Sequence, residues 1–328
     1  MKKTICYLLL FCFSLITTGS FASAPDAETN YFEFRSSYLL NLHHYLIKEG
    51  IRYNKTDSSN RSFESFFIHQ GEVNSSSKSG IMSAVKYYGD SVVKKNMLFD
   101  PELNSLKYTL LTVEAVYEIP GNSISPLWLK ALKSADAYYK DQEWKNTNAK
   151  NLLFINSHVE QVKKIEKEVI GRCEDVYQYK FTGKKFRIEI VDYATFFGAY
   201  TTNDPFVCSV ISSTDKRHDA EQGTEVIFHE VSHSMIDSLF KMQQDLCKAT
   251  SLRVDHNVWH TILFYSTGTI VKDALAGIGV KHELYIYRND LGGLSPDFRN
   301  LIDKVSAQWP LYMNRKIPME DVLKKILN

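Results

Sequence analysis

The sequence predicts an α+β fold, on three observations. Apolar residues recur at helical spacing through most of the first half of the chain. Residues 186–191 and 197–212 instead alternate as strands do, and helical spacing returns after residue 223. We therefore expect a helical N-terminal half packed on a C-terminal half that holds a small sheet between helices.

The composition excludes several classes of protein. Of the 328 residues, 44% are hydrophobic and 13% aromatic, which is enough to build a core and excludes disorder as the main state. Lys+Arg 39 against Asp+Glu 38 gives a formal charge of +1, so the chain lacks the basic surface that a polyanion attracts. Nucleic acid is therefore not an expected partner.

The first 22 residues have the pattern of a secretory signal peptide. Lys2 and Lys3 precede the apolar run Ile5–Ile16, which is too short to span a bilayer as an anchor helix. Small residues at Ser20 and Ala22 then fit positions −3 and −1 of a cleavage site. We expect cleavage after Ala22, an exported protein in the periplasm or the medium, and no stable membrane anchor.

The rest of the chain divides into two expected regions, a helical one over residues 23–150 and a second one over residues 151–328. A polar stretch rich in Ser and Asn, residues 53–80, predicts a loop or a lid-like insertion. Helical spacing predicts helices over residues 30–52, 81–118, 126–141 and 146–170, the last ending at Gly171.

Three cysteines remain after the signal peptide: Cys173, Cys208 and Cys247. An odd number cannot pair completely, so one disulfide with one free thiol is the most that they allow. A core of this size does not need disulfides, and no cysteine spacing resembles a zinc site.

The segment with the clearest chemistry is the apolar stretch around His229-Glu230-Val-Ser-His233. On a helix, histidines four residues apart project from one face and can bind the same metal ion. Zinc lowers the pKa of its bound water to about 7, and Glu230 is placed to take that proton as general base and return it as acid. Polar groups in so apolar a helix need partners, which favours a metal over two packed histidines.

This segment resembles the signature helix of the zincin metallopeptidases, and the resemblance covers about residues 186–268. In zincins the edge strand of a sheet runs along the cleft above the metal helix and pairs with extended substrate. Residues 197–211 match that strand here, with Tyr200 as the expected substrate contact. Residues 25–150 resemble no family. The metzincin pattern would need Gly and His where Ile236 and Leu239 stand, so that subclass is excluded.

The third metal ligand is the open question. The gluzincin pattern takes a Glu from a following helix, but no Glu occurs between residues 231 and 282, and Glu283 is distant. Residues 255–265 predict an apolar helix with His256 and His260 at the same spacing of four. We expect His260 as ligand because it lies deeper in the apolar run, and His256, Asp255 and Glu283 stay open as alternatives. Three histidines would leave the fourth position for water.

Tyr265 follows His260 by five residues, and its phenol is a second candidate catalytic group that could donate to a developing oxyanion. Packing is the competing interpretation in a chain with 19 Tyr. The sequence thus predicts an exported Zn²⁺-dependent metallopeptidase that acts on a peptide or protein substrate. The alternatives are a non-catalytic binding protein on the same scaffold and a zinc amidase that acts on cell-wall material.

Overall fold

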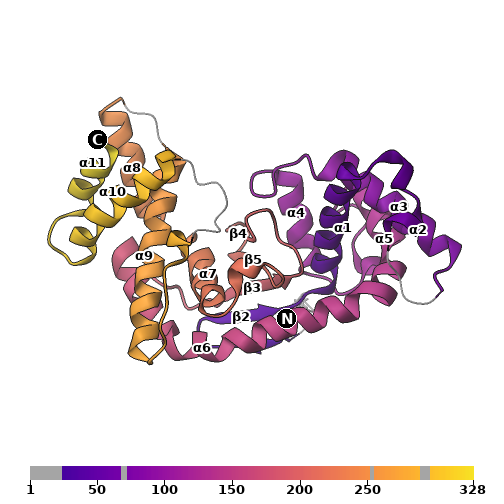
Figure 1. The fold of residues 1–328 in the computed structure, drawn as a ribbon, viewed down its shortest axis with the longest axis horizontal. Coiled ribbons are helices and arrows are strands. Elements are labelled where there is room, and N and C mark those ends of the chain that lie inside the picture. The colour runs from indigo at the N-terminus through magenta and orange to yellow at the C-terminus, as the bar shows by residue number, and fades with distance from the viewer. Residues whose placement is uncertain (1–23, 68–71, 252–254, 289–295) are drawn as a thin grey trace, which may run out of the picture.

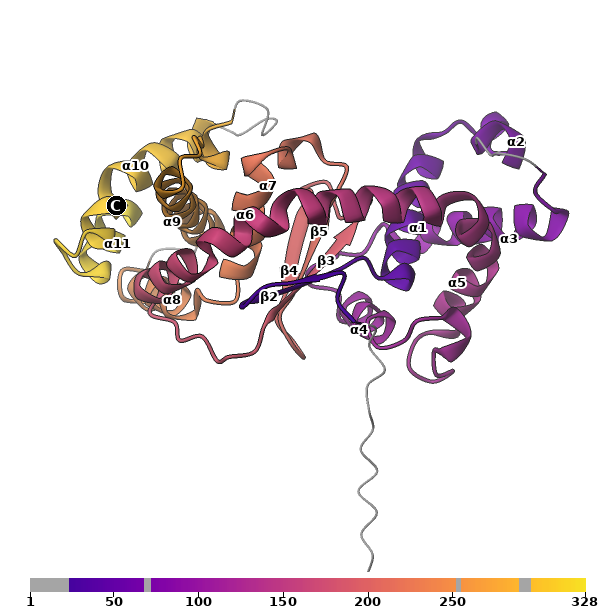
Figure 2. The ribbon, with the colours of Figure 1, turned by 90° about the horizontal axis from the view of Figure 1, so that it is seen from below.

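The computed structural model describes residues 24–67, 72–251, 255–288 and 296–328, which form an α+β fold. A small sheet lies between two groups of helices, and one long helix runs beneath both groups (Figures 1 and 2). The predicted fold class is therefore confirmed. In the described ranges, no helix combines the length and the apolar character that crossing a membrane requires. The expected signal peptide, residues 1–22, lies outside the described residues, so cleavage and export stay predictions.

The sheet has five strands in the order β1-β2-β3-β5-β4. The predicted strands are confirmed as β3 (Phe186–Val191), β4 (Ala199–Thr202) and β5 (Cys208–Ser212). β3 and β5 pair in parallel, whereas β4 pairs antiparallel with β5 and forms one edge. Every residue of β5 is buried, as expected for a strand covered on both faces.

The first strands correct one expectation. Helical spacing from residue 30 onward predicted a helix that includes Phe34, but Phe34 lies in β2 (Phe32–Arg35). β2 pairs in parallel with β3 and antiparallel with β1 (Ala27–Glu28), so the start of the chain belongs to the sheet. Phe32 and Phe34 are fully buried in the core beneath the sheet, and that burial outweighs the local helical pattern.

The N-terminal helices pack around a core of their own, separate from the core beneath the sheet. The polar stretch expected as a loop over residues 53–80 is partly helical, because Asn74 caps a helix that begins at Ser75 and accepts a hydrogen bond from the Ser77 backbone. The helices of this group are α1 (Tyr38–Lys55), α2 (Phe63–Phe66), α3 (Ser75–Tyr87), α4 (Pro101–Leu110) and α5 (Pro126–Tyr138).

Helix α6 (Lys145–Tyr177) connects the two groups and runs past Gly171, where we expected it to end. Its buried face packs against the sheet and against α7 and α9. The C-terminal helices are α7 (Glu221–Ser232), α8 (Asp237–Ala249), α9 (His256–Gly277), α10 (Pro296–Met313) and α11 (Met319–Leu327), with a short turn of helix, η6 (Tyr285–Tyr287), between α9 and α10.

All three cysteines of the described chain are free and buried. Burial raises the pKa of Cys173 to about 12 and that of Cys208 to about 11, so neither thiol ionises near neutral pH. The disulfide that the sequence left open is therefore absent from the described residues.

Glu166 fastens the β1–β2 hairpin to α6. This fully buried carboxylate accepts hydrogen bonds from the Thr29 hydroxyl at 2.5 Å, from the Asn30 backbone and side chain at 3.0 and 2.8 Å, and from the Tyr31 backbone at 3.3 Å. Each donor would lack a partner without it, and that loss is costly in a buried site.

We predict that Glu166→Ala lowers the free energy of unfolding by about 3 kcal/mol, because the buried Thr29 hydroxyl and three part-buried donors of Asn30 and Tyr31 lose their acceptor. Urea unfolding of the variant and of Glu168→Ala provides the comparison, since the Glu168 side chain on the same helix is half exposed. A loss no larger than that of the control would contradict this account of the hairpin.

Candidate metal centre

Helix α7 places His229, Glu230 and His233 at its C-terminal end. A contact with α6 holds the start of α7: Nε2 of His158 on α6 lies 3.0 Å from the carbonyl oxygen of Ala220, the residue before α7. Gly223 lets α6 approach, because a Cβ there would lie 2.3 Å from His158 Nε2. Ser232 is the last residue of α7, and α8 begins at Asp237. The His233 backbone still donates to the Glu230 carbonyl at 3.2 Å, so the motif keeps its helical spacing.

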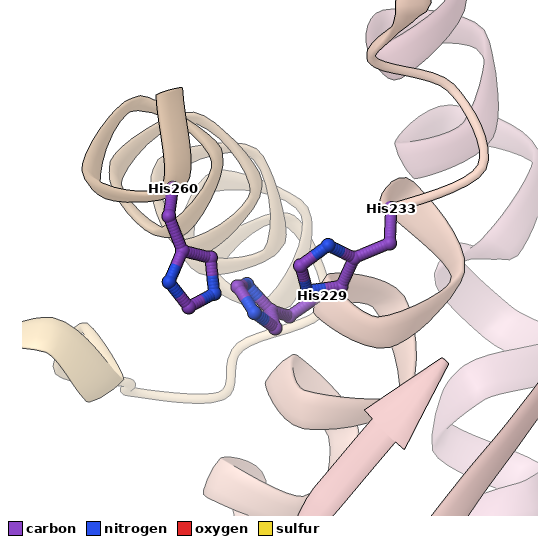
Figure 3. Close-up of side chains that lie close together, drawn as sticks. All are labelled: His229, His233 and His260. Atoms are coloured by element: carbon purple, nitrogen blue, oxygen red, sulfur yellow. The ribbon is translucent and has the colours of Figure 1, made fainter. Parts of the chain in front are cut away.

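His260, near the start of α9, faces the two histidines of α7 (Figure 3). The ring centroids of His229 and His233 are 4.9 Å apart, and the His260 centroid lies 5.4 and 5.2 Å from them. One ligand nitrogen from each ring lies within 4.8 Å of the other two. Three nitrogens on one tetrahedral zinc lie roughly 3.4 Å apart, given Zn–N bonds of about 2.1 Å. Small side-chain rotations would therefore bring the three rings onto one ion.

The other ligands left open by the sequence lie elsewhere. Asp255 caps α9 instead, accepting a hydrogen bond from the Asn257 backbone at 2.8 Å. Glu283 is exposed, and its carbonyl oxygen accepts from Gln222 at 2.8 Å. The His256 side chain lies outside the described residues. Of the four candidates, the structure brings His260 to the pair on α7.

The three rings fit a metal in charge as well as in position. Burial and the two neighbouring histidines lower the pKa of His229 well below its usual range. Burial lowers the pKa of His233 to about 3, with help from His260, and that of His260 to about 4. All three are therefore neutral at pH 7, the form in which imidazole binds zinc.

His229 also has an unsatisfied atom. Its Nδ1 is buried and has no hydrogen-bond partner among the described residues. A buried polar atom without a partner is costly, and coordination of a metal ion by this nitrogen would supply the missing partner. Three imidazole nitrogens suit zinc better than the oxygen-seeking ions Mg²⁺ and Ca²⁺.

Glu230 is buried beside the histidines and contacts the edge strand. The Thr201 hydroxyl lies 2.8 Å from Glu230 Oε2 and 2.9 Å from the Glu230 carbonyl oxygen, and 2.8 Å from the Ser209 hydroxyl. Burial raises the pKa of Glu230 to about 7, although the Thr201 hydrogen bond lowers it. A carboxyl group with this pKa can both accept and return a proton near neutral pH.

Two supporting residues escaped the sequence reasoning. Phe264 stacks on the His229 ring, with centroids 3.7 Å apart and planes at 21°. The Phe264 ring is also parallel to that of Tyr285, with centroids 6.0 Å apart and planes at 7°. Glu225 accepts hydrogen bonds from His282 at 2.5 Å and from the Tyr285 backbone at 2.9 Å. The spacing was a usable signal, because Phe264 follows His260 by four residues and Glu225 precedes His229 by four.

The two tyrosines do not take the places we expected. Tyr200 is buried against the N-terminal helices, with its hydroxyl 3.1 Å from His44 Nε2, whereas the next residue, Thr201, contacts Glu230. Neighbouring strand residues point to opposite faces, so the Tyr200 side chain lies on the face away from Glu230, and its contact with substrate stays a prediction. Tyr265 packs with Leu284, Ile286 and Ile302, five residues and therefore about 140° around the helix from His260. That placement favours packing over an oxyanion contact.

Comparisons with known proteins add no relative. No family model, no curated protein and no solved structure matches this chain.

The buried Glu230 predicts a pH dependence of stability in the metal-free protein. The pKa of this carboxyl is about 7 in the folded protein, against an ordinary value of 4.5 for glutamate. As pH rises from 4.5 through 7, the Glu230 carboxyl ionises in the unfolded chain before it ionises in the folded protein. This stabilises the unfolded chain relative to the folded one, so the free energy of unfolding falls. Glu230→Gln removes this effect, and we expect the variant to exceed the unmodified protein by about 3 kcal/mol at pH 8, at 1.4 kcal/mol per pKa unit.

The difference should shrink to about 1 kcal/mol or less at pH 5, where the folded carboxyl is already protonated. Urea unfolding at both pH values, after removal of metal with a chelator, makes the measurement. A difference that does not change with pH would show that burial does not raise the pKa of Glu230.

Proposed function

We propose that this protein is an exported zinc metallopeptidase that cleaves peptide bonds with a zinc-activated water. The observation that carries the proposal is the convergence of His229, His233 and His260 from two separate helices. The buried Glu230 follows His229 directly in α7. The sequence motif itself accounts only for His229 and His233. His260 lies 27 residues beyond His233 and reaches the pair only because α9 packs against α7.

The arrangement of elements supports a zincin-like scaffold. The edge strand β4 runs antiparallel to β5 and packs against α7, as the resemblance implied for residues 197–211. The long helix α6 packs behind α7, and α9 supplies the third histidine where a gluzincin places a glutamate. The site therefore resembles a gluzincin in layout, with His260 as its departure from the pattern.

In this proposal the zinc ion, when bound, polarises the scissile carbonyl and lowers the pKa of a water molecule. Glu230 takes the proton of the attacking water and transfers it to the leaving amine. Thr201 holds the carboxylate by donating to Oε2, while β4, the last strand of the sheet, offers backbone groups of its outer edge to an extended substrate. A nearby cation would also lower the pKa of Glu230, which favours the ionised base.

We predict that Glu230→Gln reduces hydrolysis of a mixed peptide library by about 100-fold to 10,000-fold, the usual contribution of a general base. Zinc content should stay that of the unmodified protein, because Glu230 is not a ligand. Asp237→Asn is the matched control, since Asp237 is an exposed carboxylate close to the motif. Hydrolysis is followed by mass spectrometry of the products.

Two outcomes would contradict the proposal. Unchanged hydrolysis in Glu230→Gln would remove Glu230 from the chemistry. Absence of any hydrolysis by the zinc-loaded protein, with zinc and peptide still bound, would favour the non-catalytic binding protein; activity on cell-wall fragments alone would favour the amidase.

A further inference from the structure

A pair of exposed aromatic rings stands just before the edge strand. The side chains of Phe196 and Phe197 are 76% and 70% exposed, and their ring centroids lie 5.6 Å apart at an interplanar angle of 77°. They occupy the two central positions of a tight turn, in which the Gly198 backbone donates to the Thr195 carbonyl at 3.0 Å. Gly, Pro, Asn, Asp and Ser are the usual residues at these positions, so two adjacent phenylalanines need a reason.

The surrounding contacts hold this turn firmly in place. The Phe197 backbone donates to the Thr195 hydroxyl at 3.0 Å, and Arg217 donates to the Phe196 carbonyl at 2.8 Å. Arg217 is itself fixed by Asp215, with contacts of 2.6 and 2.9 Å. Three hydrogen bonds to or from its backbone therefore hold the turn in the conformation that exposes the two rings to solvent.

Gly198 joins the turn directly to β4. Its φ of +85° belongs to the left-handed region, and a Cβ there would lie 2.3 Å from Asp215 Oδ2, so glycine is required. The Ser212 backbone donates to the Gly198 carbonyl at 2.8 Å, which carries the pairing with β5 up to the turn. Three residues further along, Thr201 contacts Glu230.

This continuity sets the distance between the rings and the site. The four residues from Phe197 to Thr201 span roughly 13 Å of extended chain, at about 3.3 Å per residue. A peptide paired with the outer edge of β4 advances at the same rate, so a side chain about four residues from Glu230 would reach the rings. Apolar surface at that position is complementary to an apolar side chain and not to a charged one.

We propose that Phe196 and Phe197 form an apolar subsite for an extended polypeptide substrate, selecting a large apolar side chain about four residues from the bond that is cleaved. The subsite rests on the proposed function, since it takes its occupant from a peptide that lies along β4 toward Glu230. It would exclude very short peptides from efficient cleavage.

The test uses pairs of peptides of about ten residues that place either Leu or Ser three, four or five residues from the cleaved bond, on either side. We expect kcat/KM of the unmodified protein to favour Leu at one of these positions by about tenfold, as an apolar pocket does. In the double variant F196S/F197S the Leu/Ser ratio should fall to near 1. Phe99→Ser is the control, because Phe99 is equally exposed (77%) in the segment before α4 and should keep the ratio.

A second measurement separates failure of the subsite from failure of the proposed function. Fluorescence anisotropy gives the Kd of the labelled Leu and Ser peptides for Glu230→Gln, with and without F196S/F197S. Tighter binding of the Leu peptide that depends on the two rings, without hydrolysis by the unmodified protein, would retain the subsite and contradict the peptidase.

Three results would overturn the subsite. One is hydrolysis with the same Leu/Ser ratio in F196S/F197S as in the unmodified protein. Another is an equal Kd for the two peptides in both backgrounds. The third is ring-dependent binding to phosphatidylcholine vesicles without any effect on peptides, which would make the turn a membrane contact.

Discussion

The packing of α7 against α9 is the contact on which the site depends. It sets His260 beside His229 and His233 at one level, stacks Phe264 on the His229 ring one turn further along, and places Gly268 opposite Glu225 one turn beyond that. A Cβ at Gly268 would lie 2.5 Å from Glu225 Oε1, so this glycine is what lets the two helices approach. The three histidines thus lie together at one end of this interhelical interface.

The constraint behind this packing is the burial of polar groups in an apolar helix. Glu225 on α7 accepts hydrogen bonds from His282 and from the Tyr285 backbone. Glu230 accepts a hydrogen bond from the Thr201 hydroxyl of the edge strand. His229 keeps a buried nitrogen without a partner among the described residues. Glu225 Oε1 on the same helix also has no partner among the described residues. His229 differs in lying within reach of two further imidazoles, so a metal ion held by all three would give these rings a common partner.

Local patterns predicted the parts of the structure that local rules govern. The alternation in residues 186–191 and the spacing of His229 and His233 both survived folding, because a strand and a helix impose those periods directly. Phe34 did not follow its helical pattern, because it pairs in parallel with Ile188 of β3, 154 residues later in the chain. The sequence also could not predict which face of the sheet the Tyr200 side chain occupies, because that face depends on the register of β4 against β5.

The site was predictable to the extent that its ligands lie on helices. His260 was identified from its depth in an apolar run. The only sequence signal for Phe264 and Glu225 was their spacing of four residues from His260 and His229, because their partners Tyr285 and His282 lie in another segment. Tyr265 shows that closeness in sequence does not place a side chain at the site. A residue five positions after His260 on a helix points well away from the face that His260 occupies.

Zinc content tests the central claim most directly. Plasma emission spectrometry of the purified protein, after reconstitution with Zn²⁺ and removal of excess ion, should give about one zinc per chain, as three neutral histidines bind a single ion. His260→Ala should lose most of that zinc, while Asp255→Asn should retain it, because asparagine also caps a helix and Asp255 is not a ligand here. Absence of zinc from the unmodified protein, or full retention by a folded His260→Ala, would contradict the three-histidine centre.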